Sequence, residues 1–327
     1  MPRRESRPLP TISRKVPPAD PPLLIWRAPL RGVFQDQREG DPFNVTTFSR
    51  QLEAGVVWRS TDEDDREMMS DYFDFYAEGH AAAEADAMIY SASVLSSEEP
   101  GLGSNFGPGL GLDTFINALS LHTAAPLSIQ LLRFEIETSD EVRIFPNSGT
   151  RLFRTVHLPS WGAAPFQQPI GTTTIDAVAD SYPRVKLVLE QSEDHGLRRS
   201  LGAYRAAISD HTFIHAIPVL LCASLEALAA SYKEASVLSR IARYAPEESK
   251  TLESLYKLRH WFAHGATIPE MKDPAVRIET LDKGIALVKE ILVRAYADTD
   301  LFEAAAQGAP AVKGYLDSSS GVRGGRT

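Results

Sequence analysis

The chain has 327 residues, and its 34 Lys and Arg against 43 Asp and Glu give a formal net charge of −9. With 43% hydrophobic and 24% charged residues it has the composition of a folded chain of about two domains. The acidic balance argues against a protein that coats nucleic acid with a basic surface, but it leaves room for a small basic site. The single cysteine, Cys222, excludes an internal disulfide and a multi-cysteine zinc site. Its apolar neighbours predict a buried, inert thiol.

Residues 1–22 predict a disordered tail, because seven prolines and several basic residues leave nothing to bury in a core. The prolines also interrupt the apolar stretch that a secretory signal needs. The longest apolar run, residues 213–230, contains His215 and Glu226 and predicts a core helix rather than a membrane span. We therefore expect a cytoplasmic protein with no membrane partner.

Residues 23–190 predict a module of mixed α and β structure, so the expected fold class is α+β. β-branched and aromatic runs bounded by turn-forming residues are typical of strands. The predicted strands are 23–26, 43–48, 127–137 and 151–158. An acidic and then alanine-rich segment is typical of helices, with acids stabilised at the helix N-terminus. The predicted helices are 61–95, as one or two helices, 113–121 and 175–181.

The same module shows no recognisable catalytic motif. Five glycines between residues 101 and 111 have the spacing GxGxxxGxGxG, which fits neither a dinucleotide-binding turn nor a Walker loop. We interpret this segment as a loop. By analogy with toxin and defence systems, our hypothesis for 23–190 is a sensing or regulatory domain.

Helical periodicity becomes strong after His195 and predicts an all-helical bundle over 195–300. Apolar stripes mark the first two helices, the second kinked at Pro218. Their members are Leu197, Leu201, Tyr204 and Ile208, then Phe213, Ile217, Leu220, Ser224 and Leu228. A shorter third helix lies around Val237, Leu238 and Ile241.

The fourth predicted helix starts near Pro246 and stops at Gly265, and the fifth opens at Asp273-Pro274. The stripe of the fifth helix is Ile278, Leu281, Ile285, Val288, Leu292 and Ala295. Residues 306–327, with Gly and Ser clusters, predict a flexible tail.

The end of the fourth helix concentrates cationic and titratable side chains on an otherwise acidic chain: Lys257, Arg259, His260 and His264. Cations near a helix C-terminus contribute about 0.3–1 kcal/mol, which accounts for the charge but not for two histidines and an arginine beside two aromatic residues. A metal site is a second explanation, because His260 and His264 are four residues apart. It lacks a clear third ligand nearby in sequence, so we expect no metal. The third explanation is a metal-free RNA-cleaving site.

The stretch Arg259-His260-Trp261-Phe262-Ala263-His264 resembles the Arg-polar-x-x-x-His signature of HEPN domains. The upstream run Ala223-Ser224-Leu225-Glu226-Ala227-Leu228 strengthens a resemblance to the Apea-like branch of that family. The similarity covers roughly the last third of the chain. It implies a C-terminal all-α HEPN-like bundle after the mixed module.

The resemblance also implies an activity: a metal-independent endoribonuclease, in toxin–antitoxin or anti-phage defence, in which the ribose 2′-hydroxyl attacks the adjacent phosphate. Histidine suits proton transfer near neutrality and arginine offers a planar fork for phosphate oxygens. His264 is therefore the expected general acid/base and Arg259 the phosphate clamp. His260 and Glu226 are expected to support them, with Glu226 pairing with Arg259 or His264, and Lys257 to bind RNA. No cofactor is implied.

Arg259 and His264 are five residues apart, so they lie about 140° apart around an ideal helix. Family members dimerise through the motif helix, and an isologous interface places each motif beside its copy. We therefore expect a homodimer, with an antitoxin or regulatory protein as a further partner. Two alternatives remain: a non-catalytic HEPN module that binds nucleotide or a partner protein, and a helical dimerisation domain with no ligand.

Overall fold

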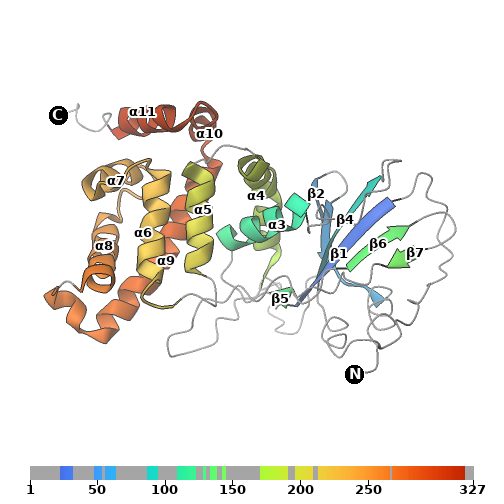
Figure 1. The fold of residues 1–327 in the computed structure, drawn as a ribbon, viewed down its shortest axis with the longest axis horizontal. Coiled ribbons are helices and arrows are strands. Elements are labelled where there is room, and N and C mark those ends of the chain that lie inside the picture. The colour runs from blue at the N-terminus through green and yellow to red at the C-terminus, as the bar shows by residue number, and fades with distance from the viewer. Residues whose placement is uncertain are drawn as a thin grey trace, which may run out of the picture. The chain divides into compact units, whose positions relative to one another are not determined.

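The structure is a computed structural model of the chain, and it describes helices and strands between residues 23 and 320 (Figure 1). The described residues are 23–31, 48–53, 56–63, 87–94, 109–122, 128–129, 133–137, 142–144, 170–190, 196–208, 213–265 and 267–320. Expectations for 1–22, for 151–158 and for most of 43–48 lie outside these ranges.

The chain divides into two compact units. The first comprises Met1–Asp113, Pro126–Thr155 and Pro169–Asp176, and the second comprises Thr114–Ala125, Val156–Gln168 and Ala177–Thr327. Strands belong to the first unit and most helices to the second, so the predicted α+β fold class is confirmed.

Seven strands among the described residues form one antiparallel sheet in the first unit. They are β1 (Leu23–Arg31), β2 (Ser49–Glu53), β3 (Val56–Ser60), β4 (Ala87–Val94), β5 (Ser128–Ile129), β6 (Arg133–Glu137) and β7 (Val142–Ile144). Their order is β2-β3-β4-β1-β6-β7, with β5 paired to β1. Trp58 of β3 is fully buried, and its ring packs edge-on against that of Phe48, with the ring centres 5.0 Å apart.

The helix predicted over 61–95 is wrong for residues 87–94, which form strand β4. β4 pairs with β1 on one side and with β3 on the other. Helix propensity is a weak preference, and pairing on both edges together with Ile89, Tyr90 and Val94 overrides the alanines of this segment.

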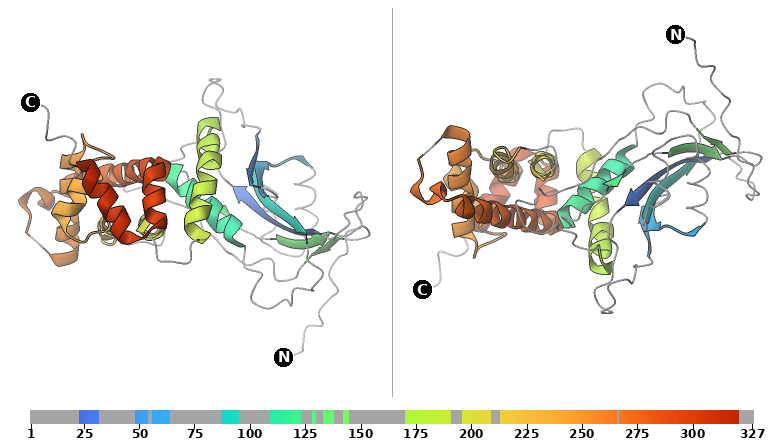
Figure 2. Two further views of the ribbon diagram at one scale, coloured as in Figure 1. Left: turned by 90° about the horizontal axis from the view of Figure 1, so that it is seen from above. Right: turned by 90° about the horizontal axis from the view of Figure 1, so that it is seen from below.

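The helices are α3 (Gly109–His122), α4 (Thr172–Glu190), α5 (Gly196–Ala207), α6 (Ile217–Leu228), α7 (Glu234–Ile241), α8 (Ser249–His264), the short 3₁₀ helix η2 (Pro269–Lys272), α9 (Pro274–Ala297), α10 (Thr299–Ala306) and α11 (Ala309–Ser320). In the second unit α5, α6, α8 and α9 pack against one another (Figure 1). Seen from above in Figure 2, α10 and α11 lie across one side of this unit, where α11 packs against α7 and α10 against α9.

The apolar stripes predicted for α5 and α9 are confirmed. All four stripe residues of α5 are buried, as are those of α9 except Ile278. α9 also begins as expected, with the Asp273 side chain accepting a hydrogen bond from the backbone N–H of Ala275 and Pro274 in the first turn.

α5 and α6 approach each other closely because small residues line their contact. A Cβ on Gly196 would come within 2.7 Å of the Ala227 carbonyl oxygen. One turn further on, the hydroxyl of Ser224 donates to the Ser200 carbonyl at 2.8 Å, and the two serine hydroxyls lie 3.0 Å apart. This close contact holds α6, the helix that carries Glu226, in a fixed position against α5.

Two local predictions for this unit are wrong. Pro218 does not kink a helix: α6 begins at Ile217, so the proline occupies the first turn, where a missing N–H costs nothing, and Phe213 before it is 82% exposed. The tail predicted over 306–327 contains helix α11. This helix is held by the buried side chains of Val312 and Leu316 and by an ion pair between Asp317 and Arg240. The Gly and Ser content of the segment did not indicate these contacts.

His122, at the end of α3, is held neutral by its surroundings. Its Nε2 lies 3.0 Å from the Ser181 hydroxyl of α4. Burial, and then the charge of Lys289, lower its pKa from 6.5 to about 4, with Asp180 opposing the shift. The unfolded chain therefore binds a proton that the folded chain does not between these two pH values.

Acid should consequently weaken the fold through His122. We expect stability to fall by about 2–3 kcal/mol as the pH drops from 6.5 to 4, with no further loss from this group below that. Urea unfolding of the wild type and of His122→Gln across this pH range tests this prediction. The free energy of unfolding of the variant should depend less on pH, because the His122 contribution is gone. Equal slopes would contradict the prediction.

None of the helices that the structure describes is both long enough and apolar enough to cross a bilayer.

Candidate functional site

The candidate site lies at the C-terminal end of α8, whose two faces differ sharply. Leu252, Leu255, Tyr256 and Leu258 are buried against the bundle. Lys257 and His264 are exposed and His260 is half-buried. Gly265 ends the helix at a positive φ of 61°, and its N–H donates to the His260 carbonyl, so the stop predicted at this glycine is confirmed.

Glu226 and Arg259 form a buried ion pair between α6 and α8. The Arg259 Nη1 donates to the Glu226 Oε1 at 2.5 Å. The glutamate side chain is only 8% exposed and the arginine side chain 26% exposed. Of the two partners considered for Glu226, the structure therefore gives Arg259. A charge-assisted hydrogen bond of this kind fixes the guanidinium plane.

The Arg259 guanidinium is hydrogen-bonded on one side only. In the part of the chain that the structure describes, the bond to Glu226 is its one hydrogen bond, and its Cζ lies 5.8 Å from the centre of the Tyr256 ring. The remaining N–H groups are free to meet an anion at the partly exposed edge.

The two histidines of the motif lie together on the exposed side of α8. Their ring centres are 5.6 Å apart. The His260 Nε2 is 3.2 Å from the Glu234 Oε2 at the start of α7, with both side chains nearly half exposed. His264 is exposed and makes no hydrogen bond among the described residues. A proton-transfer group in this position can reach a ligand without rearranging the bundle.

The segment that follows the motif folds back onto α8. The Lys257 Nζ lies 3.4 Å from the Glu270 Oε1 of η2, an exposed ion pair. Trp261 is half-buried, and the Arg277 Cζ lies 5.5 Å from its ring centre. The expected RNA-binding lysine is therefore partly neutralised in the free chain.

Buried titratable groups lie behind the ion pair. Burial raises the pKa of the Cys222 thiol and of the Tyr256 hydroxyl well above their usual ranges, so both stay protonated at neutral pH. Cys222 is fully buried, as predicted from its apolar neighbours. Among the described residues, no group of three His, Cys, Asp or Glu side chains lies close enough to hold a metal ion.

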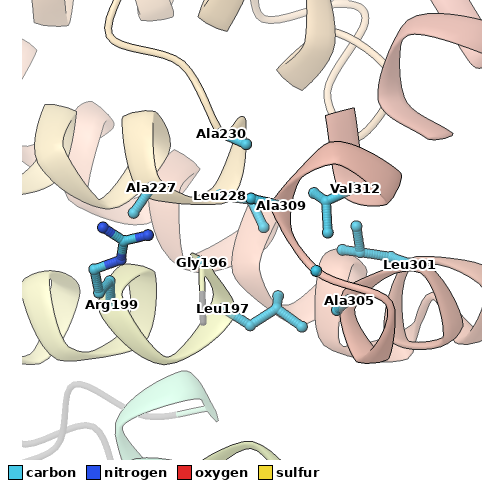
Figure 3. A pocket seen from close by; sticks show the side chains of 11 residues that line it. Gly196, Leu197, Arg199, Ala227, Leu228, Ala230, Leu301, Ala305, Ala309 and Val312 are labelled. Carbon is cyan, nitrogen blue, oxygen red and sulfur yellow. The ribbon is translucent and has the colours of Figure 1, made fainter. Parts of the chain in front are cut away.

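A pocket of about 70 Å³ lies elsewhere in the same unit, between the start of α5, the end of α6, α10 and α11 (Figure 3). Leu197, Leu228, Leu301 and Val312 line it together with small residues, and Arg199 stands at its edge. It shares no residue with the motif.

Three contacts of the site had no signal in the sequence. Glu234 and Glu270 contact the motif from other elements, and Tyr256 is a buried residue of α8. No family model, curated protein or solved structure matches the chain.

Proposed function

We propose that the helical unit is a metal-independent endoribonuclease of HEPN type. One observation carries the proposal: buried Glu226 fixes Arg259 on the same helix end that carries the neighbouring rings of His260 and His264. A core ion pair alone would not require an exposed His264 on the same helix end. A charged fork and an imidazole on one exposed helix end are what phosphodiester cleavage needs.

In this mechanism the ribose 2′-oxygen forms a bond to phosphorus while the bond from phosphorus to the 5′-oxygen breaks. One imidazole accepts the 2′-hydroxyl proton and another donates a proton to the leaving 5′-oxygen. Arg259 offers its free N–H groups to the phosphorane oxygens, where charge develops. His260, held by Glu234, orients the phosphate, and Lys257 exchanges Glu270 for a neighbouring phosphate.

A homodimer through α8 supplies the second imidazole. Because Arg259 and His264 diverge around one helix, a two-fold axis beside α8 lets each His264 face the motif of the other protomer. The same proposal places the chain in toxin–antitoxin or anti-phage defence, with a regulatory partner restraining the nuclease. That placement rests on analogy with such systems.

A specific observation favours the second candidate, a non-catalytic HEPN module that binds nucleotide or protein. Lys257 and His260 each pair with a glutamate, and the chain carries a net charge of −9. Both features weaken attraction for RNA, since non-specific affinity depends on neutralising phosphates.

RNA cleavage in EDTA by the purified full-length chain tests the proposal. We expect cleavage that chelation leaves unchanged, from a protein that sediments as a dimer. Lys250→Ala, which removes an exposed cation from the first turn of α8, is the matched control and should cleave normally. Activity lost on chelation would favour a His260–His264 metal site, and binding without cleavage would favour the second candidate. A strictly monomeric active protein would contradict the composite cleft.

A further inference from the structure

Tyr256 has a buried hydroxyl that makes no hydrogen bond within the described part of the chain. Its side chain is fully buried on α8, one turn before Arg259. Buried polar groups in native proteins almost always have partners, so an orphan hydroxyl at this position needs an explanation.

The titratable groups that act on this hydroxyl are Cys222, the Glu226–Arg259 pair and Glu234. Cys222 and Glu226 are four residues apart and so share one face of α6, and Tyr256 and Arg259 are three apart on α8. The pKa of Tyr256 is raised by burial first and then by Cys222 and Glu226, whereas Arg259 lowers it. The geometry agrees: the Arg259 Cζ lies 5.8 Å from the centre of the Tyr256 ring, and the same guanidinium is paired with Glu226.

The buried carboxylate of Glu226 needs a hydrogen-bond donor at all times, including when its bond to Arg259 is weakened. An ionised carboxylate only accepts hydrogen bonds, and a buried one without a donor is strongly destabilising. When a phosphate binds the free N–H groups of Arg259, it competes with Glu226 for the cation, and the bond that satisfies the carboxylate weakens. Among the described residues, the Tyr256 hydroxyl is buried without a partner of its own and can replace that bond, whereas the Cys222 thiol is a weak donor.

We propose that Tyr256 is the second partner of Glu226, and that its hydroxyl donates to the carboxylate when a phosphate on the free N–H groups of Arg259 weakens the ion pair. Tyr256 is then a positioning residue: it keeps Glu226 satisfied while Arg259 holds the phosphate. The phosphate step rests on the proposed function, but the exchange of partners can be tested without RNA.

Thermal unfolding of a double-mutant cycle provides that test. Alone, Tyr256→Phe should leave Tm unchanged or raise it by a few degrees, because it removes an unpaired buried hydroxyl. In an Arg259→Met background the same change should lower Tm by about 2–4 °C, because it removes the remaining donor to Glu226. An equal effect in both backgrounds would overturn the proposal.

Two controls isolate the carboxylate. Tyr204→Phe alters another fully buried tyrosine, on α5, and should act alike in both backgrounds. With Glu226→Met also present, which removes the acceptor, the effect of Tyr256→Phe should no longer depend on Arg259. A dependence that persists there would show that Glu226 is not involved, and would overturn the proposal.

Binding of a 2′-O-methylated RNA, which cannot be cleaved by 2′-oxygen attack, tests the phosphate step in a variant that needs no change at Arg259. Tyr256→Phe should weaken binding about three- to tenfold, and Tyr204→Phe should not. Normal binding by Tyr256→Phe would overturn the phosphate step of the proposal. If the wild type binds no RNA, the proposed function fails while the unfolding cycle still decides the role of Tyr256.

Discussion

Arg259→Ala and His264→Ala should each lower the rate of RNA cleavage by at least about 100-fold. Arg259→Ala removes the charge that faces the phosphorane oxygens, and His264→Ala removes the exposed imidazole that transfers protons. The measurement is the initial rate of cleavage in EDTA with saturating RNA. His264→Ala should leave Tm almost unchanged, because this side chain is exposed and makes no hydrogen bond among the described residues.

Lys250→Ala again serves as the matched control on α8, and His215→Ala as a histidine control. His215 is exposed before α6, and its ring lies 5.2 Å from that of Phe262, so its loss should alter the rate only a few-fold. Cleavage that survives both Arg259→Ala and His264→Ala would remove these residues from the mechanism.

The second large effect concerns stability and is asymmetric. Arg259→Met should destabilise the fold by about 3–5 kcal/mol, because it leaves the carboxylate of Glu226 buried without a cation. Glu226→Gln should cost only about 1–2 kcal/mol. Its amide oxygen still accepts from Arg259, and the 26% exposed guanidinium keeps access to water.

Urea unfolding of both variants measures the asymmetry. Lys283→Met is the matched control: it breaks an exposed pair with Glu279 and should leave stability almost unchanged. If Glu226→Gln destabilised as much as Arg259→Met, the burial of the carboxylate would not govern this pair.

Much of the helical unit could be predicted because its signals are local. Asp273-Pro274 and Gly265 marked helix ends through caps that involve neighbouring residues only, and the stripe on α9 followed the helical period. The misread segments depend on distant partners instead. β4 is a strand because β1 and β3 pair with it, and α11 holds its place through Arg240, 77 positions before Asp317.

The candidate site divides in the same way. The positions of Arg259, His260 and His264 on α8 follow from their spacing in the sequence. Glu226 was predicted as a supporting residue only through the family resemblance, which no comparison tests. Glu234 and Glu270, which neutralise His260 and Lys257, approach from α7 and η2. Sequence alone could not find them, since nothing local to an exposed acid indicates which cation it meets.

The measurement that tests the central claim most directly compares two RNAs of one sequence, one of them 2′-O-methylated at every ribose. The purified full-length chain is incubated with each in EDTA, and the product ends are analysed. The proposal predicts that only the unmodified RNA is cut, leaving a 5′-hydroxyl and a 2′,3′-cyclic phosphate, because the 2′-oxygen is the nucleophile. Intact unmodified RNA, or equal cutting of both, would contradict it.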